Sequence, residues 1–133
     1  MMTTQKNLEL VQQFYGHIGA GNIEGILSCV ADDIEIINPL PDHIPFGGIY
    51  KGKDGLLAYL GTLGESIEMG LDIDKFLSDG DTVVVIGVEN SSTRATGITY
   101  RMPYVHVLTV SDGKITRFDE YNQYKEMAEA FDS

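Results

Sequence analysis

The sequence predicts an α+β domain in which helices come first and antiparallel strands follow. Apolar residues recur every three or four positions up to Ile67, apart from one short β-branched segment, which is the spacing of helices. After Gly70 they alternate or run continuously, as in strands. Asp-Gly pairs at 79–80 and 112–113 separate these later segments and are typical of hairpin turns. Helices segregated from antiparallel strands indicate the α+β class.

Three helical patterns account for most of the first half of the chain. The first is expected to begin at a cap on Thr3 or Thr4 and to end at the Gly-Ala-Gly segment 19–21. Asn22 is expected to cap the second helix, and Lys53 or Asp54 to open the third. The expected apolar faces are Leu8, Val11, Phe14 or Tyr15 and Ile18; then Ile23, Ile26, Leu27 and Val30; then Leu56, Leu57, Leu60, Leu63 and Ile67.

The connection between the second and third helices is expected to be mostly irregular. Residues 31–33 (Ala-Asp-Asp) interrupt the apolar pattern, and residues 34–37 then form a short β-branched strand that Asn38-Pro39 ends. The segment from Pro39 to Lys53 is rich in proline and glycine, which favours an irregular connection.

Four strands are expected in the second half, joined as a meander. The first covers residues 71–77, and the continuous apolar run 82–88 is typical of a central strand. A long strand from about Gly97 to Val110 precedes the second Asp-Gly turn and the final strand. Residues 124–131 are expected to form a closing helical turn.

The composition limits the kinds of partner that the protein is expected to bind. The chain has 133 residues, 43% of them hydrophobic and 22% charged, and we expect a single domain over residues 1–133 with a buried core. Nine basic and 20 acidic residues give a net charge of −11. Because nucleic acids and anionic membranes are bound by positive surfaces, we expect neither as a partner.

The cysteine content and the N-terminal residues indicate the cellular compartment in which we expect the protein. Cys29 is the only cysteine, so no internal disulfide can form, and its apolar surroundings favour a buried, unreactive thiol. Residues 1–6 lack the pattern of a signal peptide, and no apolar run approaches the roughly 20 residues of a membrane helix. We therefore expect a cytoplasmic protein.

The end of the chain carries two adjacent acids, Asp119 and Glu120, in the predicted final strand. Successive strand side chains point to opposite faces, so only one of the two can face a given cavity, where it would be a candidate for proton transfer. One face would hold Ile115, Arg117, Asp119 and Tyr121, and the other Thr116, Phe118, Glu120 and Asn122.

Several short motifs, in their order and spacing, resemble the nuclear transport factor 2-like superfamily and, within it, the SnoaL-like family (polyketide cyclase and ketosteroid isomerase-like proteins). They cover nearly the whole chain: Phe14-Tyr15, residues 20–26, 31–34, Asn38-Pro39, 46–48 with Gly52, 79–84, 112–115 and Glu120-Tyr121. The resemblance implies a strongly curved, mainly antiparallel sheet wrapped by three N-terminal helices into a cone-shaped pocket, a cystatin-like roll. It also implies a homodimer through the outer sheet face, where Tyr104 and His106 are expected.

The ketosteroid isomerase pattern within this superfamily is poorly matched. The resemblance puts Asn38, Phe14 and Val105 where that chemistry needs a carboxylate base, a tyrosine and a protonated acid. An amide cannot abstract a proton from carbon, and neither Phe nor Val donates a hydrogen bond.

The limonene-epoxide hydrolase pattern is matched in part. Asn38 corresponds to its asparagine, and Glu89 and Glu120 replace its two aspartates, but Ile36 and Gly87 stand in place of its tyrosine and arginine. Two carboxylates and an amide can position a water molecule. A shift of one residue in the alignment would turn Glu89 to the other strand face.

SnoaL-like cyclases give the comparison that the sequence favours. The resemblance implies a single pocket acid that moves a proton next to a carbonyl. Many relatives end the last strand with Tyr-x-Asp, whereas here Gln123 takes the place of the aspartate. Glu120 is therefore the predicted catalytic acid or base, with Asn38 as a hydrogen-bonding orienter. The predicted pocket-lining residues are Phe14, Tyr15, His43, Phe46, Val105 and Phe118.

The predicted activity is isomerase- or cyclase-type proton transfer on a hydrophobic small molecule that has a carbonyl or a ring. Two alternatives stay open: a non-catalytic module that binds a hydrophobic small molecule, and water activation as in an epoxide hydrolase. A plain association domain would require a filled cone. The three histidines lack metal-ligand spacing, so we expect no metal and no cofactor. His43 lies in a loop, and His106 is expected to face away from the pocket.

Overall fold

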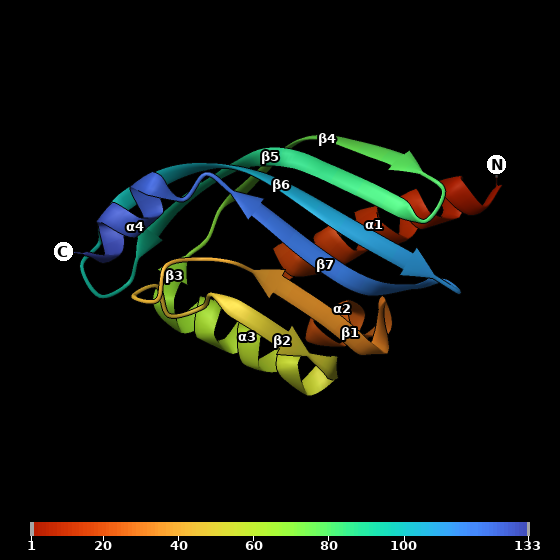
Figure 1. The fold of residues 1–133 in the computed structure, drawn as a ribbon, viewed down its shortest axis with the longest axis horizontal. Coiled ribbons are helices and arrows are strands. Elements are labelled where there is room, and N and C mark those ends of the chain that lie inside the picture. The colour runs from red at the N-terminus through yellow and green to blue at the C-terminus, as the bar shows by residue number, and fades with distance from the viewer. Residues whose placement is uncertain (1, 133) are drawn as a thin grey trace.

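The protein consists of a strongly curved sheet, with helices along one side and at one end (Figure 1). The structure is a computed structural model and describes residues 2–132. Its helices are α1 (Met2–Ala20), α2 (Ile23–Ser28), α3 (Gly52–Ser66) and α4 (Lys125–Phe131). Its strands are β1 (Val30–Asn38), β2 (Gly48–Lys51), β3 (Ile67–Glu68), β4 (Leu71–Asp79), β5 (Thr82–Thr93), β6 (Thr99–Ser111) and β7 (Lys114–Asn122).

The sheet order is β2-β1-β7-β6-β5-β3, with β4 also paired to β5. The pair β1–β7 is parallel, and the other pairs are antiparallel. Strands β4 to β7 form the predicted meander, and the α+β class with a curved, mainly antiparallel sheet is confirmed. The two chain ends lie at opposite ends of the long axis (Figure 1).

Local signals predicted the two hairpin turns and the cap of α2 correctly. Asp112 and Gly113 have φ values of 51° and 74°, the two positive values that a type I′ hairpin turn needs. Asn22 caps α2, because its side-chain oxygen accepts a hydrogen bond of 3.1 Å from the Gly25 amide. Gly80, in the other hairpin, also has a positive φ of 59°.

The cap expected at Thr3 or Thr4 is wrong, because both residues lie within α1 and the Thr4 hydroxyl accepts a hydrogen bond from the Gly80 amide. Helix α3 begins at Gly52, just before the expected Lys53 or Asp54.

The first strand is longer than predicted. Residues 31–33 do not interrupt the regular structure, because β1 runs from Val30 to Asn38. Val30 therefore belongs to this strand and not to the second helix. Between Val30 and Glu35 the register against β7 shifts, so the polar Asp32 and Asp33 sit in an irregular stretch that lacks regular pairing. Without periodicity, the sequence could not predict this extension.

Three further boundaries differ because pairing with distant residues decides them. Residues 48–51, expected to be irregular, form β2 and pair with β1. Ile67, expected on the third helix, pairs in β3 with Thr93. Strand β5 continues past Val88 to Thr93, because its polar end pairs with the start of β6.

The core lies between α1, α3 and the concave face of the sheet. It includes Val11 and Phe14 from α1, Leu56 from α3 and Leu108 from β6, all nearly inaccessible to solvent. In β7 the predicted alternation holds from Phe118 onward but fails earlier, where a register shift against β6 buries Ile115. No helix within residues 2–132 combines the length and apolarity that a lipid bilayer span requires.

Candidate functional site

A cavity of about 50 Å³ lies between α1, α3 and the concave side of the sheet. By this measure it has room for about four water molecules. Its wall is mostly aromatic and aliphatic, and its polar side chains are Tyr15, Asn38, Tyr59, Glu89, His106, Glu120 and Asn122. The described residues that line it include no lysine or arginine.

Among the polar side chains of this wall, Glu120 contacts the hydroxyl, imidazole and amide groups of three neighbouring residues. The side chain is 8% exposed and receives a short hydrogen bond on Oε2 from the hydroxyl of Tyr59. Its Oε1 lies 3.4 Å from Nε2 of His106 and 3.5 Å from Nδ2 of Asn122. A buried carboxylate is stable when donors surround it in this way.

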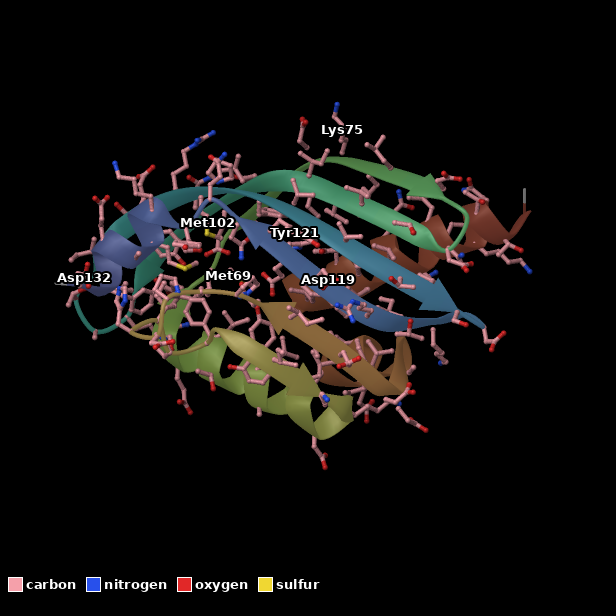
Figure 2. The ribbon with its side chains drawn as sticks, viewed as in Figure 1. Met69, Lys75, Met102, Asp119, Tyr121 and Asp132 are labelled. Atoms are coloured by element: carbon pink, nitrogen blue, oxygen red, sulfur yellow. The ribbon has the colours of Figure 1, made fainter. Side chains whose placement is uncertain are left out.

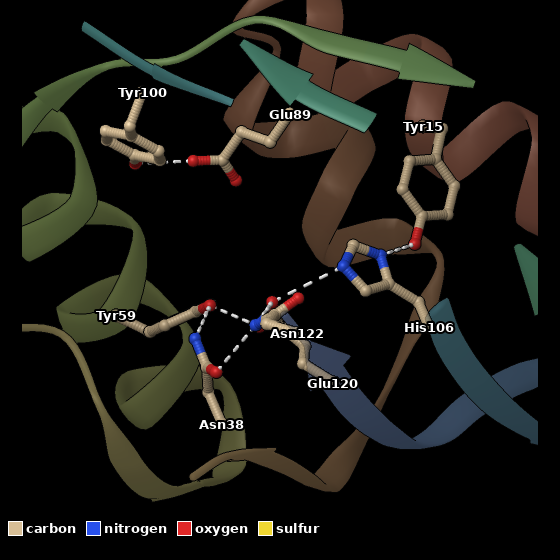
Figure 3. A network of polar contacts seen from close by, with 8 residues as sticks. All are labelled: Tyr15, Asn38, Tyr59, Glu89, Tyr100, His106, Glu120 and Asn122. Carbon is tan, nitrogen blue, oxygen red and sulfur yellow. Dashed lines mark hydrogen bonds and ion pairs between the residues drawn. The ribbon is translucent and has the colours of Figure 1, made fainter. Parts of the chain in front are cut away.

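Two amides extend this arrangement behind Tyr59 (Figure 3). Nδ2 of Asn38 donates to the Tyr59 hydroxyl at 3.0 Å, and Oδ1 of Asn38 accepts from Asn122 at 3.0 Å. The Tyr59 hydroxyl therefore accepts from one amide while it donates to Glu120. These groups come from β1, α3 and β7, so the fold fixes the orientation of the carboxylate from three directions.

A second chain of contacts reaches Glu120 through a histidine. The Tyr15 hydroxyl lies 2.5 Å from Nδ1 of His106, and Nε2 of the same ring faces Glu120. A neutral imidazole with its proton on Nε2 satisfies both contacts, because Nδ1 then accepts from Tyr15 and Nε2–H donates to Glu120. We assign this tautomer on that basis.

Electrostatics keep both tyrosines protonated. Burial and, second, the negative charge of Glu120 raise the pKa of Tyr15 and of Tyr59 well above the usual value of 10.0. Both hydroxyls are consequently hydrogen-bond donors at neutral pH.

Glu89 is a second buried carboxyl group in the same wall. Its Oε2 accepts a 2.6 Å hydrogen bond from the hydroxyl of Tyr100. Burial raises the pKa of Glu89, and the hydrogen bonds from Tyr100 and Ser91 oppose this rise only in part. The sequence left open which face of its strand Glu89 occupies, and in the structure Glu89 faces the cavity.

The structure places six predicted site residues in the cavity wall: Asn38, Glu120, Phe14, Tyr15, Phe46 and Phe118. Asp119, the neighbour of Glu120, points the other way and accepts a 2.7 Å hydrogen bond from Arg117 on the outer face. Figure 2 labels Asp119 and Tyr121 on this strand.

Val105 does not line the cavity, which corrects the prediction. It is half-buried on the outer face, paired with the exposed Tyr121, whereas Tyr104 and His106 point inward and are buried. The prediction that Tyr104 and His106 face outward is therefore wrong. Strand β6 carries apolar residues on both faces, so its pattern did not fix the register, and a shift of one residue reverses every side chain.

His43 also lies outside the cavity wall. Its ring is exposed, with Nε2 3.0 Å from the carbonyl oxygen of Ala128 and 3.2 Å from Asp132, so it connects the loop before β2 to α4. Within residues 2–132, no three His, Cys, Asp or Glu side chains are grouped as a metal site would require.

Sequence reasoning missed Tyr59, gave Asn122 no role in the site and placed His106 on the outer face. Tyr59 follows Leu56 by three residues and therefore shares the buried face of α3, which was a usable signal. Asn122 shares the Glu120 face by strand alternation. The inward position of His106 depends on the register of β6 against β7, which the sequence alone does not give.

Known proteins share the sequence pattern and the fold of this chain. The family described as the SnoaL-like domain matches residues 11–118. An NTF2-like protein from Burkholderia xenovorans LB400 is 30% identical, with a TM-score of 0.90 over 98% of this chain and 99% of that protein. TerC, co-crystallised with polyporic acid, is 30% identical, with a TM-score of 0.87 over 96% of this chain and 99% of TerC. The uncharacterized protein Rv0034 of Mycobacterium tuberculosis is 25% identical over 98% of each chain.

Proposed function

Because the chain belongs to the SnoaL-like domain family, we propose that it is a cofactor-independent enzyme that moves a proton on a hydrophobic, carbonyl-bearing small molecule. Glu120 is the acid–base group in this proposal. The observation that carries it is a buried carboxylate at a cavity wall, held by donors from Tyr59, His106 and Asn122. Such convergence of a few polar groups in an apolar cavity is the usual form of a small-molecule site.

The chemistry follows from what each group can accept or donate. Glu120 takes a proton from a carbon next to the carbonyl, and the C–H electron pair forms the enolate. The same proton returns to another carbon or to oxygen, which completes an isomerisation or prepares ring closure. Tyr59 holds the carboxylate in place, and His106 with Tyr15 provides a path for exchange of the proton.

Neutral, apolar substrates suit this cavity best. No lysine or arginine in the described wall compensates a negative ligand, and the wall is mostly aliphatic and aromatic. A substrate must displace flexible side chains, because about 50 Å³ holds only a few waters. Met69, Met102 and Met127 line the cavity and are the residues best able to move. TerC was co-crystallised with polyporic acid, a cyclic carbonyl compound that ionises, so the search begins among cyclic carbonyl compounds and, for this cavity, among the uncharged ones.

The test compares two neighbouring carboxylates that face opposite ways. The probe is 2-tetralone in D₂O, whose acidic C–H positions report proton abstraction by NMR. Glu120→Gln should reduce enzyme-dependent deuterium exchange by at least about 100-fold, within the usual range for general acid–base catalysis. Asp119→Asn is the matched control and should retain the wild-type rate, because Asp119 pairs with Arg117 on the outer face.

Equal rates for Glu120→Gln and the wild type would refute the assignment. Calorimetric binding of 2-tetralone without enzyme-dependent exchange of its acidic C–H positions would instead support the non-catalytic binding module.

A further inference from the structure

A groove on the surface of the protein, here called the outer groove, lies between α1, α2 and α3. It has a volume of about 380 Å³, and its wall is mainly aliphatic, with Ile23 of α2 42% exposed. Arg94 is the one charged side chain among the described residues of this wall. The proposed proton transfer gives the outer groove no role.

Four side chains border both the outer groove and the cavity that contains Glu120: Ile18, Leu60, Leu63 and Met69. The first three are partly buried, whereas Met69 is 41% exposed although it also lines the cavity. Met69 lies in the two-residue link between β3 and β4 and is labelled in Figure 2. Because a methionine side chain is unbranched and adapts its shape easily, its movement would join the two spaces.

The shared side chains lie one helical turn beyond the catalytic group. The hydroxyls of Tyr15 and Tyr59 belong to the hydrogen-bonded arrangement around Glu120. Ile18 follows Tyr15 by three residues on α1, and Leu63 follows Tyr59 by four on α3. Residues at these spacings share a helix face, about 5 Å apart along the axis. A ligand with its ring at Glu120 therefore reaches the outer groove through a substituent on the far side of the ring.

A glycine in α3 leaves the outer groove open. Gly64 lines the groove, and a Cβ at this position would meet no other atom within 4 Å. Its φ is not positive, so the backbone would accept another residue. Glycine is unfavourable inside a helix compared with alanine. Neither packing nor backbone conformation requires glycine here, and the space beside it is available to a ligand.

The charge at the edge of the outer groove is already compensated. Nε of Arg94 donates a 2.6 Å hydrogen bond to the Gly64 carbonyl, and its guanidinium group lies 3.9 Å from the carboxylate of Glu68. The remaining wall is apolar and offers little to a charged group. An uncharged hydrocarbon chain is the occupant that this surface suits.

We propose that the outer groove binds an alkyl chain of the substrate while the ring and its carbonyl lie in the cavity beside Glu120. The cavity of about 50 Å³ is too small for both parts, and the four shared side chains connect the two spaces. This inference rests on the proposed function and narrows the substrate class to cyclic carbonyl compounds with an alkyl chain placed away from the carbonyl group.

The test compares 4-methylcyclohexanone with 4-pentylcyclohexanone, which differ by four methylene groups, and measures the Kd of each by calorimetry. Each buried methylene strengthens binding about fourfold, so the wild type should bind the pentyl compound at least about 50-fold more tightly. Gly64→Leu fills the outer groove and should reduce this ratio to less than about tenfold, with the affinity for the methyl compound unchanged. Gly61→Leu is the matched control and should keep the wild-type ratio, because Gly61 lies on the same helix, also has no atom within 4 Å of a Cβ, and is outside the groove wall.

A second variant acts on the opposite side of the outer groove. Ile23→Ser removes an exposed apolar side chain from α2 and should lower the ratio about fourfold, the contribution of one buried methylene. A wild-type ratio near one, or a ratio that neither variant changes, would overturn the inference. A sedimentation change in Gly64→Leu with an unchanged ratio would assign the groove to a protein contact and would also overturn it.

Deuterium exchange next to the carbonyl of the same two ketones separates this inference from the proposed function. The expected affinity ratios without enzyme-dependent exchange would support the chain site and overturn the proton transfer alone. Exchange that depends on Glu120, together with a ratio that Gly64→Leu leaves unchanged, would overturn the chain site alone.

Discussion

Replacing Tyr59 with phenylalanine removes one oxygen atom from the centre of the Glu120 arrangement. That oxygen donates to the carboxylate and accepts from the Asn38 amide, and the residue is 5% exposed. The ring remains, so its packing against Tyr50, with ring centroids 4.8 Å apart, is preserved. The variant therefore isolates the two hydrogen bonds from the hydrophobic contribution of the side chain.

The expected loss of stability follows from these two bonds. A hydrogen bond to a charged group contributes about 2 kcal/mol, and leaving the buried amide without its acceptor costs about 1 kcal/mol more. The free energy of unfolding should fall by about 3 kcal/mol. With a urea slope of about 1.5 kcal/mol per molar, the unfolding midpoint should fall by about 2 M.

Urea unfolding followed by circular dichroism measures this difference, and Tyr50→Phe provides the matched control. The Tyr50 hydroxyl is half-buried and makes one long bond of 3.4 Å to the Gly47 carbonyl, so its removal should change stability by less than about 0.5 kcal/mol. If the two variants unfold at the same urea concentration with the same slope, the arrangement around Glu120 does not stabilise the protein and the reasoning fails.

Two further predictions concern pH and assembly. The raised pKa of Glu89 means that the folded chain binds this proton more tightly than the unfolded chain, so the resulting stability is complete below the usual pKa of 4.5 and is lost as pH rises through the raised value. Thermal melts across that window should show Glu89→Gln gaining relative to the wild type; a constant difference would contradict the shift. The homodimer expected through the outer sheet face should appear in sedimentation at micromolar concentration, and Tyr121→Lys, at a 61% exposed position, should weaken it. A monomeric wild type would refute that expectation.

Features that depend only on neighbouring residues, such as turns and strand faces, could be predicted from the sequence. The Asp112-Gly113 turn set the start of β7, and alternation from that turn placed Glu120 and Asp119 on opposite faces. This held even though a register shift near Ile115 disturbed the strand, because the alternation resumes at Phe118. The relative orientation of two adjacent residues needs no knowledge of the partner strand.

Register between distant strands could not be predicted in the same way. The sequence placed Val105 inside and His106 outside, and the structure reverses both. The error had chemical consequences, because it removed the histidine from the site and made Glu120 seem isolated. Tyr59 was missed for a related reason: only the packing of α3 on β1 brings its hydroxyl to a carboxylate 61 residues away.

The acidic composition acquires a chemical meaning once the cavity is known. A net charge of −11 and a cavity with two carboxyl groups but no lysine or arginine in its described wall both disfavour an anionic ligand. Two buried carboxyl groups that line one cavity each disfavour the negative charge of the other. Glu120 faces three donors, whereas burial and the nearby charge of Glu120 raise the pKa of Glu89. The two acids therefore differ in their surroundings, an asymmetry that suits a neutral carbonyl compound and that neither residue would have in isolation.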